Sequence, residues 1–280
     1  MEAMTDATAL IDSFTAAHAA DSDEDLARAL VHDAGQLADR MRAQGLTTDY
    51  KTSISDVVTE ADRTAEAFVA GVLSALRPGD GLLGEEGASR ASTSGRTWVI
   101  DPVDGTYNFT SGFSYYCSAL ALVEGDPLAP DALLFGAVHR PTPATTYFGG
   151  PGIPTTVNGE PVAPLTPRRM AETSLVTYLH PGTMNPGPVR DTWLAVAGQF
   201  ATLRMFGAGS VDLSLVATGH AGAWIQRAGA VWDWWPGKAL VEGAGGAARR
   251  VEAGGTAWLV AGSTAIVDEI AAAFAAVDAQ

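Results

Sequence analysis

The sequence has one cysteine, Cys117, and few histidines, five in 280 residues. A single thiol cannot form an intrachain disulfide, and no two histidines lie close enough in the sequence to suggest a zinc site. Cys117 lies in an apolar run with no basic residue nearby to activate it, so we expect a buried structural thiol. No apolar run approaches the ~18 residues of a membrane-spanning helix, so we expect no membrane association.

Basic residues are also scarce, with 17 Lys and Arg against 32 Asp and Glu and a net charge of −15. Nucleic acids are bound through patches of Lys and Arg, so this composition argues against a nucleic-acid partner. A hydrophobic content of 47% and a charged content of 18% are typical of a soluble globular protein. The first residues include none of the basic stretch typical of a signal peptide, so the expected location is the cytoplasm.

The spacing of apolar residues predicts mixed α and β structure in layers. Residues 1–21 are expected to be a helical or frayed lead-in, followed by helices at 23–42 and 59–76. Strands are then expected at 97–100, 117–123, 133–139 and 145–148, with a hairpin at 157–160. The rest of the chain alternates between strands (174–179, 203–206, 222–226 and 257–261) and helices (210–218, 238–244 and 263–277).

The most informative segment is 98–109, in which an apolar strand-like run leads into Asp101, Asp104 and a Pro/Gly turn. Two carboxylates this close repel each other and are costly to bury, and a divalent cation removes that cost. Hard oxygen ligands suit Mg²⁺ or Mn²⁺ better than Zn²⁺. The backbone N–H groups of Gly105 and Thr106 come next and could bind an anion, as at the start of a helix. The segment therefore suggests metal-assisted phosphate chemistry.

Further acidic residues occur at the ends of expected elements. Glu85 follows a strand-like run, and Asp233 precedes Pro236 near the expected start of a helix. Thr59 and Asp62 open the second expected helix. Taken singly, Asp233 and the Thr59–Asp62 pair are also typical of helix caps, so their role stays open on this evidence alone.

Four motifs in this order resemble the signatures of the inositol monophosphatase family, a group of Mg²⁺-dependent, lithium-sensitive phosphatases. They are D-x-x-T-x-x-D at 56–62, G-E-E at 84–86, D-P-V-D-G-T-x-N-F at 101–109 and W-D-x-x-x-G…G-G at 232–246. The resemblance implies an α+β or α/β layered sandwich with the layer order α-β-α-β-α, and a homodimer. A Pro-rich polar stretch marks a boundary between an N-terminal subdomain, 1–160, with most of the metal ligands and a C-terminal subdomain, 161–280, with Asp233.

The resemblance also implies two or three Mg²⁺ ions, for which Mn²⁺ can substitute. The first would be held by Glu85, Asp101 and the backbone carbonyl of Val103. The second would be held by Asp101, Asp104 and Asp233.

A third, weaker metal site would involve Glu85 and water held by Asp62, with Thr59 beside it. Thr106 would orient the attacking water with Glu85 as the base, and the lesser alternative is an ordinary helix-start hydroxyl. Lys51 matches a lysine found in relatives near the active-site loop, or is simply solvated.

Substrate contacts are implied for residues in both halves of the chain. They are Gly105, Thr106, Gly207, Ala208, Gly209, Gln226 and Asp233. Ala208 replaces the usual Thr or Ser, which removes one hydroxyl contact. Gln226 replaces a Glu common in relatives, so it offers hydrogen bonds but no charge for an ammonium group. Arg227 is either a partner for a second anionic group or a surface charge, and Trp234 and Trp235 are either core or an apolar wall beside the site.

The predicted function is therefore Mg²⁺-dependent hydrolysis of a small polyol phosphate, with inositol monophosphate as the first candidate. Histidinol phosphate is the main alternative substrate, followed by fructose 1,6-bisphosphate and 3′-phosphoadenosine 5′-phosphate. A second class of function, regulation through binding to other proteins, also stays open, because some relatives of this family bind cellular machinery.

Overall fold

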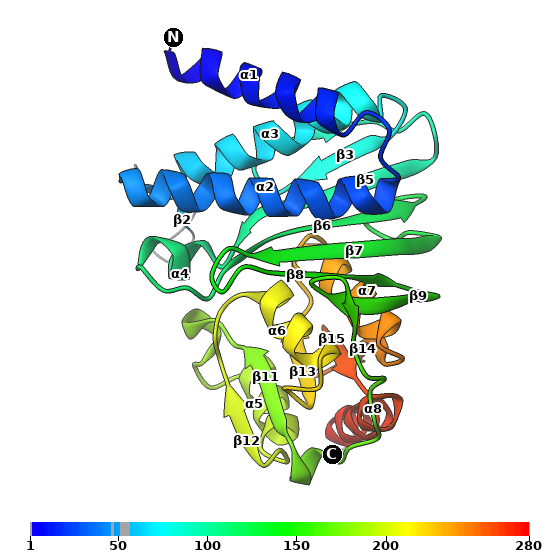
Figure 1. Cartoon of the computed structure of the whole chain (residues 1–280). Helices are drawn as coiled ribbons and strands as arrows, with labels where there is room; N and C mark the ends of the chain where they lie inside the picture. Colours follow the sequence, from blue (N-terminus) through cyan, green and yellow to red (C-terminus); the bar gives the residue numbers. More distant parts are fainter. Residues whose placement is uncertain (1, 46–47, 51–56, 280) are drawn as a thin grey trace.

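The computed structural model describes residues 2–45, 48–50 and 57–279, so the predictions for Lys51 and Asp56 lie outside the described residues. Most of its strands form a large sheet in the order β10-β9-β8-β7-β6-β5-β3-β4 (Figure 1). These strands are β3 (Gly81–Gly84), β4 (Ser89–Arg90), β5 (Arg96–Asp104), β6 (Cys117–Glu124), β7 (Ala132–Arg140), β8 (Thr145–Gly150), β9 (Ile153–Val157) and β10 (Glu160–Pro161).

A smaller sheet has the strand order β12-β11-β13-β15-β14. Its strands are β11 (Ser174–Tyr178), β12 (Thr202–Arg204), β13 (Ala223–Arg227), β14 (Ala247–Ala253) and β15 (Thr256–Gly262). β1 (Thr48–Tyr50) and β2 (Val57–Thr59) form a separate antiparallel pair. Within the described residues, no helix has the combination of length and apolar content needed to cross a membrane.

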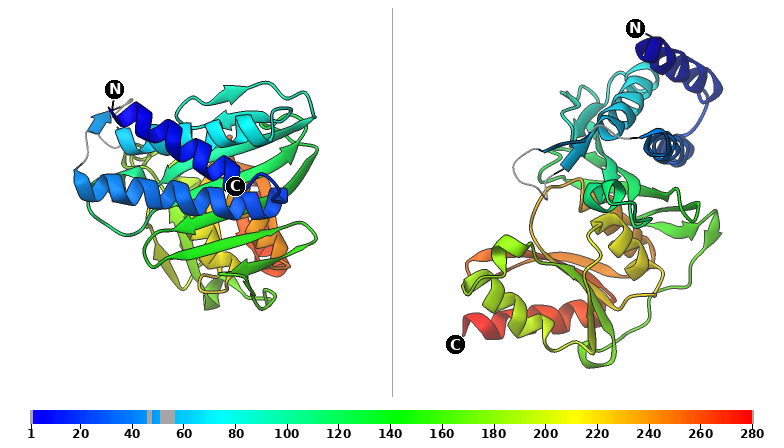
Figure 2. Two further views of the ribbon diagram at one scale, coloured as in Figure 1. Left: turned by 45° about the horizontal axis from the view of Figure 1, so that its top comes forward. Right: turned by 90° about the vertical axis from the view of Figure 1, so that its left-hand side faces the viewer.

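The helices form three layers around the two sheets. They are α1 (Glu2–Ala17), α2 (Asp23–Gln44), α3 (Glu60–Leu76), α4 (Thr106–Thr110), α5 (Pro188–Ala197), α6 (Gly209–Ala217), α7 (Trp235–Gly243) and α8 (Thr264–Asp278), with short 3₁₀ turns η1 (Met170–Glu172) and η2 (Pro181–Thr183). α2 and α3 cover one face of the large sheet and carry α1, whereas α6 and α7 lie between the two sheets (Figure 1). α5 and α8 cover the outer face of the small sheet, at the opposite end of the molecule from α1 (Figure 2). The predicted α-β-α-β-α order is confirmed.

The two predicted N-terminal helices are confirmed, and their starts follow from local chemistry. Ser22 caps α2 by accepting a hydrogen bond from the Asp25 N–H at 3.1 Å. A buried apolar stripe on α2, which includes Leu26 and Leu30, then packs on the large sheet. Thr59 caps α3, whose inward stripe includes Phe68 and Val72.

Other elements differ from expectation at their ends. The predicted strand 203–206 stops at Arg204, because the chain turns at Gly207 with φ +80° and the Phe206 carbonyl accepts a hydrogen bond from Asn108. β14 was not expected, since it is an edge strand whose exposed Arg and Glu residues hide its alternation. α5 was also missed, because it begins at a proline after a stretch rich in Gly and Pro.

The large sheet ends at Pro161 and the small sheet begins at Ser174. The division into residues 1–160 and 161–280 remains a proposal, since α7 from the second half packs on β7 and β8 of the first half. This packing brings the loop before α7 against the end of β5.

Candidate active site

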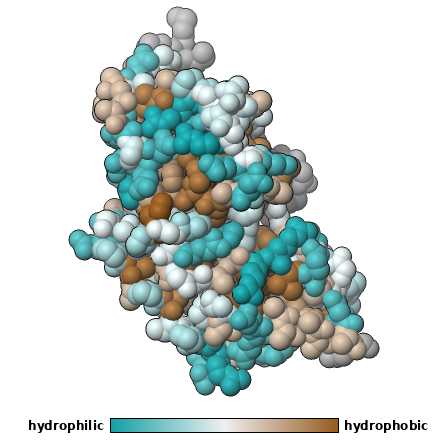
Figure 3. Space-filling view, turned by 90° about the vertical axis from the view of Figure 1, so that its right-hand side faces the viewer, coloured by the Kyte–Doolittle hydropathy of each residue, from teal (hydrophilic) through white to brown (hydrophobic). Residues whose placement is uncertain are grey.

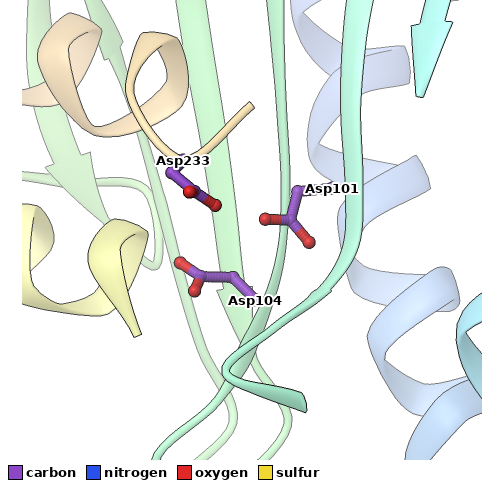
Figure 4. A group of neighbouring side chains, drawn as sticks. All are labelled: Asp101, Asp104 and Asp233. Atoms are coloured by element: carbon purple, nitrogen blue, oxygen red, sulfur yellow. The ribbon is translucent and has the colours of Figure 1, made fainter. Parts of the chain in front are cut away.

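Two aspartates of β5 and a third from a distant part of the sequence meet at the end of this strand. One carboxylate oxygen from each of Asp101, Asp104 and Asp233 lies within 4.8 Å of the others (Figure 4). In a regular strand, side chains three residues apart point to opposite faces. The pairing of β5 with β6 is irregular between Asp101 and Asp104, where Pro102 has no N–H to donate to the ladder. This break allows both carboxylates of β5 to face Asp233.

Asp101 lies among other carboxylates with nothing in the described residues to balance its charge. It is fully buried, and neither carboxylate oxygen meets a hydrogen-bond donor at bonding distance among the described residues. Burial, followed by the nearby carboxylates of Glu85, Asp104 and Asp233, holds the pKa of Asp101 well above its ordinary value. Buried acids that lack donors and cations fit a divalent cation, which would supply the missing charge and use the free oxygens.

This arrangement predicts that Asp101→Asn raises the stability of the metal-free protein. An acid whose folded pKa is raised binds more protons when folded, so its contribution to stability falls as pH rises above the unfolded value near 3.8 and through the folded pKa. Asparagine has no carboxyl group to ionise, so the variant does not lose this stability as the pH rises. We expect the melting temperature in EDTA at pH 7.5 to rise by roughly 3 °C or more, and the difference from wild type to shrink as pH is lowered. A lower melting temperature at neutral pH would contradict this.

Asp104 is hydrogen-bonded to backbone groups from the C-terminal half of the chain. Its two oxygens accept hydrogen bonds from the backbone N–H groups of Gly209 at 3.1 Å and Ser210 at 2.5 Å, in the first turn of α6. Burial raises the pKa of Asp104, and these two donors oppose the increase. The predicted substrate segment therefore contacts a predicted metal ligand directly.

Glu85 follows β3, which runs parallel to β5. Its N–H donates to the carbonyl oxygen of Ile100, the residue before Asp101, at 3.2 Å. The predicted ligands Glu85 and Asp101 therefore lie next to each other. The loop after Glu85 is anchored by Glu66, whose carboxylate accepts hydrogen bonds from the N–H groups of Glu86 at 2.8 Å and Ala88 at 2.7 Å. Gly84 leaves the room for this contact, because a Cβ there would lie 2.3 Å from Glu66 Oε2.

Glu66 was missed by the sequence analysis, although a signal was present. It is a buried acid on the inward face of α3, one helical turn after Asp62, among apolar neighbours. A charged residue in such a stripe is rare unless it is hydrogen-bonded. We infer that Glu66 positions Glu85.

Glu66→Gln tests this inference. The amide keeps the volume but offers one acceptor where two N–H groups require one each, so we expect the free energy of unfolding to fall by about 1–3 kcal/mol. We also expect the activating Mg²⁺ concentration to rise, because Glu85 lies beside the loosened loop. The exposed Glu60 on the same helix supplies the control, Glu60→Gln. Equal urea midpoints and equal Mg²⁺ requirements for the two variants would contradict a positioning role.

Thr59, Asp62 and Thr106 form a hydrogen-bonded chain that leads from the buried start of α3 to the cavity wall. Asp62 accepts hydrogen bonds from the N–H of Thr59 at 2.9 Å and from its hydroxyl, which completes a capping box at the start of α3. The Thr106 hydroxyl lies 3.2 Å from Asp62 Oδ1 and 3.0 Å from the carbonyl oxygen of Val103. Thr59 and Asp62 therefore cap the helix and also contact the predicted catalytic hydroxyl. Burial raises the pKa of Asp62 despite the hydrogen bonds it accepts from Thr59.

Gly105 joins the two halves of the site at the start of α4. Its φ is +91°, and a Cβ there would lie 2.9 Å from Cβ of Ala208 and 3.0 Å from the Tyr115 carbonyl oxygen. Asn108 strengthens this junction, since its side-chain amide donates to the carbonyl oxygens of Tyr115 at 2.9 Å and Phe206 at 2.7 Å.

A cavity of about 990 Å³ opens beside these groups. The predicted substrate-contact residues all lie in its walls: Gly105, Thr106, Gly207, Ala208, Gly209, Gln226 and Asp233. Glu85 and Asp104 also line it. The sequence analysis missed a group of wall residues with large side chains, namely Tyr107, Tyr178, His180, Met205 and Phe206.

The sequence left the roles of Arg227, Trp234 and Trp235 open, and none of these residues lines the cavity. Arg227 is exposed and does not line the cavity. Trp234 is core, because it is buried and stacks on Trp224 with ring centroids 5.6 Å apart. Trp235 is partly buried, and its indole N–H donates to the carbonyl oxygen of Pro127 at 2.9 Å. Neither tryptophan forms the apolar wall.

Comparison with known proteins places these features in a family. Residues 20–277 match the sequence model of the inositol monophosphatase family. An inositol-1-monophosphatase of Rhizobium meliloti is 32% identical over 204 residues, which cover 72% of this chain and 74% of that protein. A histidinol-phosphatase of Mycobacterium tuberculosis is 32% identical over 221 residues, 74% of this chain and 79% of that protein. The crystal structure of extragenic suppressor protein suhB from Bartonella henselae superposes with a TM-score of 0.78 at 24% identity, covering 89% of this chain and 97% of that one.

Proposed function

The chain belongs to the inositol monophosphatase family of metal-dependent phosphatases, and on that basis we propose that it hydrolyses a small phosphate monoester with Mg²⁺ as its metal. One observation carries the proposal. Asp101, Asp104 and Asp233 offer oxygens within 4.8 Å of one another, Asp104 and Asp233 line the cavity, and Asp101 has no hydrogen-bond donor among the described residues. All-oxygen ligands favour Mg²⁺ over Zn²⁺, and Mn²⁺ is expected to substitute.

In this proposal Glu85, Asp101, the Val103 carbonyl, Asp104 and Asp233 hold Mg²⁺. When bound, the metal would neutralise the carboxylates, lower the pKa of water and stabilise charge on the leaving oxygen.

The groups proposed to act on the attacking water are Thr106, Asp62, Thr59 and Glu85, of which Glu85 is also a proposed metal ligand. The Thr106 hydroxyl orients the attacking water, and Asp62 holds that hydroxyl while Thr59 holds Asp62. Glu85 accepts the proton from the water. These assigned roles support direct transfer of the phosphoryl group to water. Such a transfer requires positioning and charge neutralisation rather than a covalent enzyme intermediate.

Substrate contacts are proposed from the backbone of Gly105 and of residues 207–209, with the Gln226 amide facing the alcohol. Inositol monophosphate and histidinol phosphate are the first candidates, because relatives carry names for both activities. The expected homodimer, lithium inhibition and cytoplasmic location remain predictions.

The test is phosphate release from inositol 1-phosphate, histidinol phosphate, fructose 1,6-bisphosphate and 3′-phosphoadenosine 5′-phosphate, with Mg²⁺ and with EDTA. We expect Mg²⁺-dependent release from at least one monoester, and loss of release in EDTA that added Mg²⁺ restores. Release that is unaffected by EDTA, or no release from any ester while Mg²⁺ binds, would contradict the proposal. The second result would favour the regulatory alternative.

A further inference from the structure

A buried hydrogen bond joins the two halves of the chain next to the acidic cluster. The hydroxyl of Tyr115, in the segment before β6, donates to Asp212 Oδ1 at 2.5 Å. Asp212 lies in the first turn of α6 and is 1% exposed. Most polar side chains of a protein remain in water, as on the face turned away from α4, where hydrophilic residues are interspersed with hydrophobic ones (Figure 3). A fully buried acid therefore requires an explanation.

The burial of Asp212 is not explained by stability alone. Its second oxygen, Oδ2, is also buried and meets no hydrogen-bond donor among the residues that the structure describes. Burial raises the pKa of Asp212 well above its ordinary value, and the Tyr115 hydroxyl opposes this increase. Burial, followed by Asp212, also raises the pKa of Tyr115, so the hydroxyl keeps its proton and remains the donor. Apolar groups of the same shape can replace such a buried pair at little cost in stability.

The Tyr115–Asp212 pair completes a ring of contacts around Asp104. On one side, Asp104 pairs with Cys117 of β6, two residues after Tyr115. On the other side, the Asp104 carboxylate accepts a hydrogen bond from the N–H of Ser210, two residues before Asp212. The Tyr115–Asp212 bond therefore ties β6, which pairs with β5 at Asp104, to the helix whose first turn holds the Asp104 carboxylate.

Other contacts hold Tyr115 in place without its hydroxyl. Its carbonyl oxygen accepts a hydrogen bond from the Asn108 amide at 2.9 Å, and its ring centroid lies 4.7 Å from that of Phe206. The Arg140 guanidinium lies over the ring, 5.3 Å from its centroid. A phenylalanine at this position would keep all of these contacts. Removal of the hydroxyl alone therefore breaks the link to α6 and leaves the surrounding structure in place.

We propose that Tyr115 and Asp212 are positioning residues, which hold the first turn of α6 where it orients Asp104 toward the metal. The inference rests on the proposed phosphatase function, because Asp104 is one of its proposed metal ligands. Groups that hydrogen-bond a metal ligand fix its orientation, and their loss weakens metal binding. Without the Tyr115–Asp212 bond, α6 keeps its buried apolar contacts, but its first turn is free to shift against Asp104.

Tyr115→Phe and the double variant Tyr115→Phe/Asp212→Leu test the proposal. The single variant leaves Asp212 buried without its donor and should melt at a lower temperature. The double variant replaces both partners by apolar groups, so its melting temperature in EDTA should be no lower than that of the wild type. In both variants we expect the apparent Kd for Mn²⁺, measured from the EPR signal of the free ion, to rise by about 5-fold or more. The Mg²⁺ concentration for half-maximal phosphate release should rise by a similar factor.

Tyr116→Phe is the matched control, because it removes a neighbouring hydroxyl that donates to Asp39 of α2 at the same distance, 2.5 Å. It should leave the Kd for Mn²⁺ and the Mg²⁺ requirement unchanged. Asp212→Asn keeps an acceptor for the Tyr115 hydroxyl and should also remain close to the wild type.

Three results would contradict these expectations. A stable double variant that binds Mn²⁺ as tightly as the wild type would overturn the positioning role and leave the phosphatase function intact. An equal loss of Mn²⁺ affinity in Tyr115→Phe and Tyr116→Phe would do the same, because it would reflect a general loss of stability. Absence of Mg²⁺-dependent phosphate release by the wild type from any ester would overturn the phosphatase function and this inference with it.

Discussion

Asp101→Asn is expected to lower kcat/KM for any accepted phosphate monoester by about 1,000-fold or more. The substitution keeps the shape of the side chain and removes the charge of a residue proposed to hold both principal metals. Loss of charge neutralisation at a phosphoryl-transfer site costs several kcal/mol of transition-state stabilisation, which corresponds to this factor. The measurement is the initial rate of phosphate release at saturating Mg²⁺, because a simple loss of metal affinity would be rescued by more metal.

The matched control is Asp12→Asn, which makes the same chemical change at an exposed position of α1. It should retain wild-type kinetics. An Asp101→Asn protein with more than a tenth of wild-type activity at saturating Mg²⁺ would contradict the proposed role. Because the same variant is expected to be more stable without metal, inactivity through unfolding would be detected by its melting curve.

Thr106→Val is expected to give the second largest effect, a loss of about 100-fold in kcat with a smaller change in KM. Valine fills the same space but lacks the hydroxyl that lies 3.2 Å from Asp62 Oδ1 and 3.0 Å from the Val103 carbonyl. Misplacement of a reacting group by about 1 Å can cost roughly 100-fold in rate. Steady-state kinetics with each accepted ester provides the measurement.

Thr106→Ser should recover most of the activity, because it restores the hydroxyl without the methyl group. Thr110→Val, in the same short helix, removes a hydroxyl that donates to the Tyr107 carbonyl oxygen, and it should change kcat little. If Thr106→Val and Thr110→Val were equally active, the Thr106 hydroxyl would be an ordinary part of the turn.

The parts of the site that lie close together in sequence could be predicted from it. Asp101, Asp104 and Gly105 fall in one turn, and the spacing of two acids around Pro102 already suggests a metal. The capping pair Thr59 and Asp62 could be assigned to the start of a helix from the same kind of local chemistry. Elements with strong periodicity, such as α2 and α3, were likewise predicted almost to their ends.

Features that depend on contacts between distant segments could not be predicted in the same way. The bulge that aims Asp101 and Asp104 to one side is set by pairing with β6, and the large side chains that line the cavity come from separate elements in both halves of the chain. Glu66 acts on a loop about 20 residues away, and its own position gives no hint of which N–H groups it will bond. The role of Trp234 also required the structure, because stacking on Trp224 is a contact of tertiary packing.

The central claim is that Asp101, Asp104 and Asp233 bind the catalytic divalent metal. A crystal structure of the protein grown with Mn²⁺, with diffraction data collected at the manganese absorption edge, tests it most directly. The expected result is an anomalous peak in contact with oxygens of all three carboxylates, and no such peak in Asp101→Asn. Absence of any anomalous peak among these carboxylates in a protein that hydrolyses phosphate esters in the same Mn²⁺ buffer would contradict it.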